Sequence, residues 1–334
     1  MTGVDRRINE RIWDRSLVLT AIVVAIVSIA SLGVAWKTSA NVVSRFSFLW
    51  ITVVFSAALV SYSLRILRFY FFLSRGGVPI SLRDTLVVQV VGFALSVTPG
   101  RVGEIFKLHL IRERAGVPVM QTAPLLFLDR LTEGGGFMTL ALVSALALPA
   151  LRDQTPLSLL TLVGLALICV FALTREQWKR QIAIFASRLS KSQIGSQIVP
   201  HLENLTRGAE TSFTPSQILG GLGFSVCARF ADGLVVLFVA QMLGVALTLP
   251  AAVFILAVSG LAGGVSFLPA GTGAVEATMA GMLVIMGVPL SNAIAIALVT
   301  RLFILWVWVA LGLVMVFRLR LALFDSPPKA SGEL

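Results

Sequence analysis

The apolar run at 17–36 is the feature that most limits what this chain can fold into. It holds 20 residues without a charged side chain, which is the length that an α-helix needs to cross a hydrocarbon core about 30 Å thick. A cleaved secretory signal has a shorter apolar region that ends at small residues, so we expect a retained span. Further apolar runs, most of them with a few charged residues, occur at 48–73, 124–149, 157–173, 218–243 and 290–317. The pattern predicts an all-α polytopic membrane protein with about six full transmembrane helices.

The composition supports a membrane setting. Hydrophobic residues make up 57% of the chain and charged residues 13%, whereas about a quarter of the residues in soluble domains are charged. The formal net charge of +11 could suggest a nucleic-acid partner, but the Lys and Arg residues lie between apolar runs rather than on one face. Positive-inside topology explains them better. We therefore expect no nucleic acid and two cytoplasmic ends, at 1–16 and 318–334.

Two short hairpins are predicted where the chain breaks between apolar runs. In the stretch 98–107, a Pro-Gly pair and then Arg, Glu and Lys directly follow an apolar run that is too short for an upright span. Hydrocarbon offers no partner to free backbone groups, so broken backbone at this depth must be buried in protein or line a wet cavity. The stretch 267–276 has the same design. We predict re-entrant hairpins around 85–115 and 251–287. The residues that form the breaks are Pro99, Gly100, Gly103, Pro269, Gly271 and Gly273.

The chain then reads as two similar halves, at 17–149 and 157–317. Each half has three full crossings and one hairpin, and an odd number of crossings makes the second half an inverted repeat of the first. Short, Gly/Pro-interrupted segments at matching positions of inverted halves indicate a transporter's substrate site. If each short segment instead crossed fully, the two ends of the chain would stay on the same side, and charge counting does not separate these topologies.

One sizeable extramembrane segment is expected, at 174–214. Its apolar residues recur at helical spacing and basic residues flank them, which predicts an amphipathic helix on an anionic cytoplasmic leaflet. The alternative is a helix packed on the protein's own loops.

Charged residues also occur inside the predicted spans. Arg65 and Arg68 are three residues apart and share a helix face, so they either snorkel to the interface or contact a lipid phosphate. Arg229 and Asp232 have the same spacing, and their mutual pairing is the plain explanation.

A third charged group is the run Asp129, Arg130 and Glu133, which precedes three glycines. Its spacing allows Glu133 to pair with the neighbouring cation on one helical face. The glycines would let another backbone approach closely.

These motifs resemble the transmembrane, flippase-like region of the lysylphosphatidylglycerol synthase family. The resemblance is carried by the run 99–104 with Lys107, the Asp129-Arg130 pair, and the run 269–276 followed by Arg301. It implies a membrane region in the bacterial inner membrane that moves a lipid between leaflets. The best-known members carry a carboxyl-terminal aminoacyl-transferase domain, whereas this sequence ends soon after its last span and so resembles the stand-alone members.

At the later motif the family commonly shows Pro-Gly-Gly-Leu-Gly, whereas this chain has Pro-Ala-Gly-Thr-Gly at 269–273. The motif keeps its small residues, but residue 270 is alanine, so this position does not strictly require glycine.

Lipid translocation fits these residues chemically. A headgroup phosphate must exchange its hydration for cations and backbone N–H groups; Arg101 offers a bidentate contact and Lys107 a point charge. Glu104 and Glu276 would hold the cations of an empty site, or carry a proton. In the alternative, Arg101–Glu104 and Arg301–Glu276 pairs only pin the hairpins. The candidate substrate-binding residues are Arg65, Arg68, Arg101, Glu104, Lys107, Asp129, Arg130, Glu133, Glu276 and Arg301.

Enzyme functions are less well supported. The sequence has no Walker A loop, no Gly-x-Ser-x-Gly elbow and no His-Glu-x-x-His pair, so we expect no catalytic residue, metal or cofactor, and a lipid substrate such as an anionic phospholipid or a polyprenyl phosphate. Two alternatives stay open. One is an intramembrane lipid transferase that uses Asp129, Glu133 and Arg130, with the two carboxylates in acid–base catalysis. The other is a non-transporting subunit that docks a lipid- or glycan-synthesis enzyme through the basic helix at 178–189.

Overall fold

The computed structural model describes residues 47–95, 102–149, 164, 212–266 and 268–324. These residues are helical, and none of them forms a strand. The predicted span at 17–36, most of the span at 157–173 and nearly all of the segment 174–214 lie outside the described residues.

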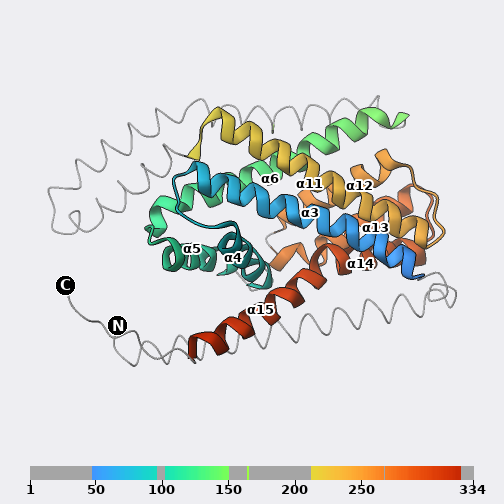
Figure 1. The fold of residues 1–334 in the computed structure, drawn as a ribbon. Helices are drawn as coiled ribbons and strands as arrows, with labels where there is room; N and C mark the ends of the chain where they lie inside the picture. Colours follow the sequence, from blue (N-terminus) through green and yellow to red (C-terminus); the bar gives the residue numbers. More distant parts are fainter. Residues whose placement is uncertain (1–46, 96–101, 150–163, 165–211, 267, 325–334) are drawn as a thin grey trace, which may run out of the picture.

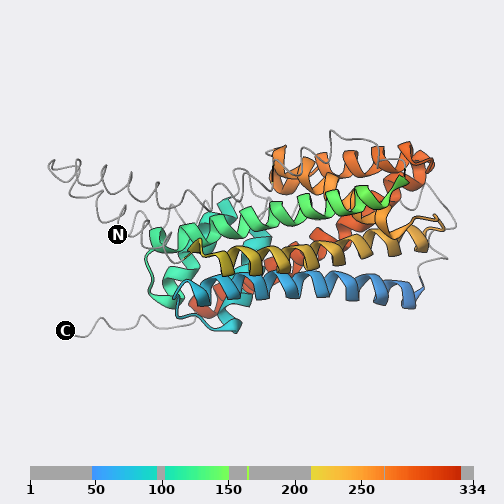
Figure 2. The same ribbon diagram turned by 90° about the horizontal axis from the view of Figure 1, so that it is seen from above.

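Three long helices run side by side and form the centre of the molecule. They are α3 (Phe48–Arg75), α6 (Val119–Ala147) and α11 (Pro215–Met242), and α11 packs against both of the others (Figures 1 and 2). Side-chain caps begin two of them: the Ser47 hydroxyl accepts a hydrogen bond from Trp50 N at 3.4 Å, and the Thr214 hydroxyl accepts one from Gln217 N at 3.3 Å. These caps satisfy N–H groups that a first helical turn leaves without partners.

Three helical stretches are long and apolar enough to cross a membrane. They are Phe48–Arg75, Pro215–Met242 and Leu290–Arg318, and they confirm the spans predicted at 48–73, 218–243 and 290–317. Helix α6 is 29 residues long, but it carries the charged run Asp129, Arg130 and Glu133 in its first half.

Each predicted hairpin region contains two short helices that pack on each other. The first pairs α4 (Leu82–Leu95) with α5 (Val102–Ala115), and the second pairs α12 (Leu249–Val265) with α13 (Ala274–Ile285) through the 3-10 turn η2 (Pro269–Gly271). The two hairpins lie toward opposite ends of the long helices (Figures 1 and 2).

The last membrane stretch contains a local irregularity. Helix α14 (Leu290–Arg301) passes through a π-helical turn, η3 (Leu302–Trp306), into α15 (Val307–Phe324). Two carbonyl groups of this turn accept hydrogen bonds from side chains: Trp308 Nε1 donates to Phe303 O at 3.1 Å, and the Tyr62 hydroxyl donates to Ile304 O. Helix α14 packs on α13 and α11, whereas α15 packs on α4.

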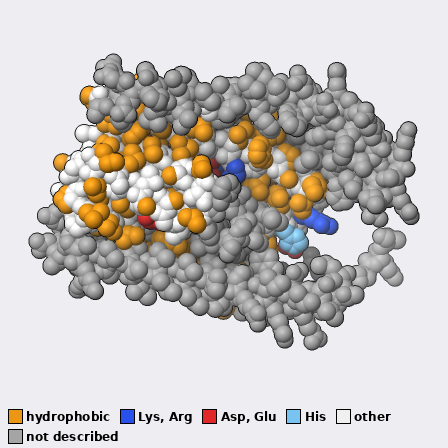
Figure 3. All heavy atoms as spheres, turned by 180° about the vertical axis from the view of Figure 1, so that it is seen from behind, with side chains coloured by type: hydrophobic (Ala, Val, Ile, Leu, Met, Phe, Trp, Pro, Cys, Tyr) orange, Lys and Arg blue, Asp and Glu red, His pale blue; other side chains and the backbone are white. Residues whose placement is uncertain are grey.

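The interior and the surface are both apolar, as a bilayer requires. One buried cluster joins α3, α11, α12, α13 and α14, and a second joins the first hairpin to α3 and α6. On the outside, large hydrophobic side chains such as Phe48, Leu219 and Phe317 are more than half exposed, and Figure 3 shows hydrophobic side chains spread over much of the described surface. Such a surface suits contact with lipid chains.

Gly221 sets how closely α3, α6 and α11 approach. A Cβ atom at this position would overlap the ring of Phe72 and lie 3.1 Å from Cγ2 of Thr132. By contrast, a Cβ atom at Gly223 on the same helix would meet no atom within 4 Å.

We expect Gly221→Ala to lower the free energy of unfolding in detergent by about 1–3 kcal/mol, because overpacking moves helices apart. Gly223→Ala is the matched control and should leave stability unchanged or raise it by up to about 1 kcal/mol, since alanine is the better helix former. Thermal unfolding of both variants measures the difference, and equal midpoints would contradict the close approach.

Candidate functional site

Seven charged side chains from three helices form one largely buried chain of ion pairs, which we call the arginine–carboxylate chain. Helix α3 contributes two arginines, α6 contributes two carboxylates and one arginine, and α11 contributes one of each. Its members are Arg65, Arg68, Asp129, Arg130, Glu133, Arg229 and Asp232.

One end of the arginine–carboxylate chain is centred on Arg68. Its Nε and Nη2 atoms both lie 2.8 Å from Asp129 Oδ1, and Nη1 donates to the Ser225 hydroxyl at 2.6 Å. Nη2 also lies 3.9 Å from Glu133 Oε2. Arg68 is 2% exposed and Asp129 1% exposed, so this arginine points into the protein and does not snorkel.

Glu133 links the two ends of the arginine–carboxylate chain. Its Oε2 accepts from Arg130 Nη1 at 2.5 Å and its Oε1 accepts from Arg229. Arg229 in turn donates from Nη1 to Asp232 Oδ2 at 2.8 Å, and Arg65 pairs with the same oxygen. Two intrahelical pairs predicted from spacing, Arg130–Glu133 and Arg229–Asp232, are therefore confirmed.

The pairing within the arginine–carboxylate chain offsets the energetic cost of burying its charges. An isolated charge in a low-dielectric interior costs several kcal/mol even after relaxation, and only a well-placed counter-charge with hydrogen bonds offsets this. The guanidinium fork suits such pairing because it is planar and presents several donors. The paired carboxylates thus make it possible for Arg65, Arg68 and Arg229 to lie inside the helix bundle, with the partly exposed Arg130 at its edge.

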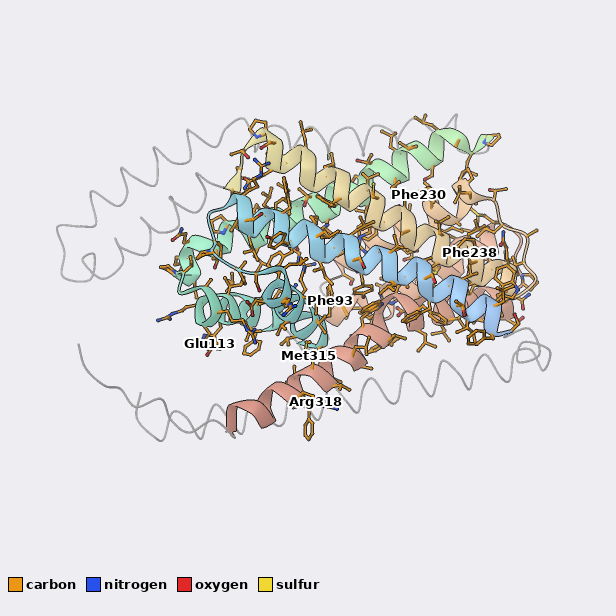
Figure 4. The ribbon with its side chains drawn as sticks, viewed as in Figure 1. Phe93, Glu113, Phe230, Phe238, Met315 and Arg318 are labelled. Atoms are coloured by element: carbon orange, nitrogen blue, oxygen red, sulfur yellow. The ribbon has the colours of Figure 1, made fainter. Side chains whose placement is uncertain are left out.

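An aromatic cluster borders the Arg65 end of the arginine–carboxylate chain. The Arg65 guanidinium lies 4.6 Å from the ring centroid of Tyr62, and this ring stacks on Trp308 at 3.8 Å and meets the edge of Phe93 at 5.0 Å. Figure 4 labels Phe93 in the middle of the bundle, whereas Arg318 projects outward from α15. The cluster joins α3 to α4 and α15 next to the buried charges.

Lys107 is buried inside the first hairpin. It is 1% exposed, its Nζ donates to Gln89 Oε1 at 2.5 Å, and it lies 5.5 Å from the Phe69 ring and 5.2 Å from the Phe93 ring. Gly92 leaves room for its methylene stem, since a Cβ atom there would overlap it. Lys107 therefore faces α3 and α4 rather than solvent.

A surface ion pair ties the outer ends of the first hairpin together. Asp84, at the start of α4, accepts a hydrogen bond from the Ser81 hydroxyl at 2.6 Å and pairs with Arg114 in the last turn of α5. The Ser81 hydrogen bond and the Arg114 contact lower the pKa of Asp84 below its usual value. The Asp84–Arg114 ion pair is partly exposed and is separate from the arginine–carboxylate chain.

The second break is held by Arg301 and Glu276. Arg301 Nε donates to Glu276 Oε1 at 2.8 Å, and Arg301 Nη2 donates to the Ala270 carbonyl at 2.8 Å. The other carboxylate oxygen of Glu276 accepts from Gly273 N at 2.7 Å, at the first turn of α13. The Arg301–Glu276 pair of the alternative interpretation is thus present, and the bond from Arg301 to Ala270 holds η2 against α14.

The predicted site residues are brought together only in part. Arg65, Arg68, Asp129, Arg130 and Glu133 lie in the arginine–carboxylate chain, whereas Glu276 and Arg301 form the separate clamp at η2.

The first break is less fully described than the second. Pro99, Gly100 and Arg101 lie outside the described residues, and so does the side chain of Glu104. Gly103 lies in the first turn of α5 rather than in the break. At the second break, Pro269 and Gly271 form η2, and Gly273 is the residue that precedes α13.

Sequence reasoning missed the wider role of α11. Arg229 and Asp232 had been explained as a local pair, and Ser225 was not considered. The available signal was two opposite charges in an apolar span, which indicate a functional site by default. Within the described ranges, no three His, Cys, Asp or Glu residues gather in a group that could hold a metal ion.

Comparisons with known proteins agree with the membrane architecture. The family model described as the lysylphosphatidylglycerol synthase TM region matches residues 16–312. The chain is similar to a UPF0104 membrane protein of Methanothermobacter thermautotrophicus, with 26% identity over 258 residues that cover 71% of this chain and 74% of that protein. No solved structure matches the chain.

Breaking one buried pair should destabilise the protein strongly. We expect Arg68→Met to lower the free energy of unfolding by about 3–5 kcal/mol, because Asp129 would keep a buried, uncompensated charge. The double variant Arg68→Met/Asp129→Leu should regain most of that loss. Chemical unfolding in detergent measures both, and a double variant no more stable than the single one would contradict the pairing.

Relaxing the second break should have the opposite effect. Ala270 has φ 51° and ψ 17°, a left-handed conformation that costs a residue with a side chain roughly 1–2 kcal/mol. We expect Ala270→Gly to stabilise the protein by about 1 kcal/mol while keeping the carbonyl that binds Arg301.

The same substitution in the interior of α13, Ala280→Gly, is the control and should destabilise by about 1 kcal/mol. Thermal midpoints that fall in both variants would show that residue 270 is not strained.

Proposed function

Because the chain belongs to the family of the lysylphosphatidylglycerol synthase transmembrane region, we propose that it moves a phosphate-bearing lipid between membrane leaflets without hydrolysing nucleotide. The arginine–carboxylate chain is the observation that carries this proposal. Ionisable side chains are rare inside membrane helices and mark pathways for polar substrates.

The chemistry of the proposal is an exchange of anions on the arginines. A phosphodiester and a carboxylate present similar pairs of oxygens to a guanidinium fork. Asp129, Glu133 and Asp232 keep the arginines neutralised when the site is empty, and a headgroup phosphate takes over one or more of these contacts during passage. The guanidiniums then replace the water that the phosphate loses, which lowers the cost of moving the charge through the membrane.

The two hairpins suggest how the site opens to each side. They lie toward opposite ends of the long helices (Figure 1), as two inverted halves would place them, and alternating access in such transporters arises when one half rocks against the other. We propose that Arg101 and Glu104 at the first break act as counterparts of Arg301 and Glu276 at the second. Backbone N–H groups at the start of α5 and α13 add a favourable environment for an anion.

The remaining details of the proposal follow from charge. The distribution of Lys and Arg favours cytoplasmic ends for the chain in a bacterial inner membrane, and an anionic phospholipid or a polyprenyl phosphate suits a site rich in arginine.

An intramembrane transferase is the alternative. It would require Asp129 or Glu133 to accept and release protons. Asp129 is held by Arg68, and both oxygens of Glu133 are held by arginines. Such contacts favour fixed carboxylate charges, so we place transport ahead of transfer chemistry.

Lipid sidedness in proteoliposomes is the test. Purified protein should move labelled phosphatidylglycerol or a polyprenyl phosphate between leaflets, and Arg68→Gln, Arg229→Gln, Arg101→Gln and Glu104→Gln should each slow this at least about tenfold, since one charged hydrogen bond contributes about 1.5–3 kcal/mol. Arg75→Gln is the matched control because Arg75 is exposed at the end of α3, and it should transport normally.

Correctly folded protein that moves none of these lipids would refute the translocase. Normal transport in the Arg68 and Arg229 variants would refute the assigned site instead.

A further inference from the structure

One oxygen of the arginine–carboxylate chain has no hydrogen-bond partner. Arg65 and Arg229 both bind Oδ2 of Asp232, whereas Oδ1 of this carboxylate is buried and has no partner. Among the residues that the structure describes, no other buried carboxylate oxygen lacks a hydrogen-bond partner. By contrast, both oxygens of Glu133 are occupied by arginines. Asp232 itself is 0% exposed.

The register of α3 and α11 places a second buried polar group without a hydrogen-bond partner, a hydroxyl, at the level of Asp232. Helices α3 and α11 run antiparallel, since Phe72 meets Gly221 and, one turn further along each helix, Arg68 binds Ser225. Two more turns bring Ser61 of α3 opposite Asp232 of α11. The Ser61 hydroxyl is buried at 0% exposure and has no hydrogen-bond partner. Buried polar atoms of this kind need an explanation, such as a proton, a water or a functional role.

The charged groups around Asp232 determine when a proton can bind. They are Arg65 on α3, Arg229 on α11 itself, and Arg130 and Glu133 on α6 beyond Arg229. The titratable Tyr62 on α3 is also near, and Arg301 on α14 acts on Tyr62. Helix α12, which also packs on α11, has no charged residue. With Arg65 and Arg229 in place, the two guanidinium groups balance the negative charge of the carboxylate. If both arginines turn to another anion, a buried carboxylate is left without its counter-charges, and the neutral acid becomes the favoured form.

We propose that Asp232 takes up one proton on Oδ1 when an anionic phosphodiester binds Arg65 and Arg229, so that lipid and proton move together. The inference rests on the proposed lipid transport and adds its coupling. The phosphodiester brings one negative charge and displaces the carboxylate from both guanidiniums, and the proton forms an O–H bond at Oδ1. The charge of the site is the same before and after, which avoids adding net charge to the interior. Once the acid has formed, its O–H group can donate to the Ser61 hydroxyl, directly or through one water.

Proton uptake on binding is the experiment. Full-length protein in weakly buffered detergent is titrated with dihexanoyl phosphatidylglycerol, binding is followed by calorimetry, and released or absorbed protons are followed with a pH indicator. A second arm uses dimethyl phosphate, which has the same phosphodiester charge but no acyl chains. We expect about one proton absorbed per bound phosphodiester, and binding without uptake in Asp232→Asn. The control Asp84→Asn removes a partly exposed carboxylate on α4 and should absorb the proton normally.

The outcomes separate the coupling from the transport proposal. Binding of phosphatidylglycerol without proton uptake in the native protein would overturn the coupling and leave the translocase standing. Uptake that persists in Asp232→Asn would overturn the choice of residue. If dimethyl phosphate binds and phosphatidylglycerol does not, or if neither binds, the lipid proposal fails together with the coupling.

A spectroscopic readout of the native protein avoids dependence on a variant that does not fold. Infrared difference spectra should gain a protonated-carboxyl band when phosphatidylglycerol binds. Ser61→Ala should bind the lipid and shift that band, because the hydrogen-bond partner of the acid is removed. A native spectrum without a new carboxyl band would overturn the proposal.

Discussion

A guanidinium group is tolerated inside a membrane protein only if counter-charges and hydrogen bonds replace its hydration. Helices α3, α6 and α11 satisfy that condition for one another, because each carries charges whose partners lie on another helix. The pairs also fix the register of α3 and α11. A slip by one turn would separate Arg68 from Ser225 and Arg65 from Asp232, and would push Phe72 away from the space that Gly221 leaves. Charge pairing and close packing therefore specify the same arrangement.

The parts of the fold that depend on local pattern could be predicted from the sequence. Apolar runs gave three confirmed spans, and the Pro-Gly and Pro-Ala-Gly breaks gave the two helix pairs α4–α5 and α12–α13. Spacing also predicted the Arg130–Glu133 pair, since residues three apart meet on one helix face. The full count of spans, the inverted repeat and the segment 174–214 remain predictions.

The interhelical part of the site could not be predicted, because spacing along one helix says nothing about its register against another. Arg229 bonds Glu133 and Asp232 at once, yet only the second partner lies within a turn of it. The same limit hid the contacts of Arg65 and Arg68. At the second break, the sequence shows an alanine at residue 270, but only the backbone shows its positive φ angle. That strain is local to a turn, which agrees with the tendency of unusual backbone to occur beside functional groups.

The π-helical turn η3 gives the last membrane stretch two different faces. One extra residue in a helical turn rotates everything after it by roughly 100° about the helix axis. Before the turn, α14 lies against α13 of the second hairpin; after it, α15 lies against α4 of the first. A regular helix would present the α14 face and the α15 face in line, and so would not meet both neighbours in this way. The stretch thus contacts both hairpins through one continuous piece of backbone, with the two contact faces offset by the π-helical turn.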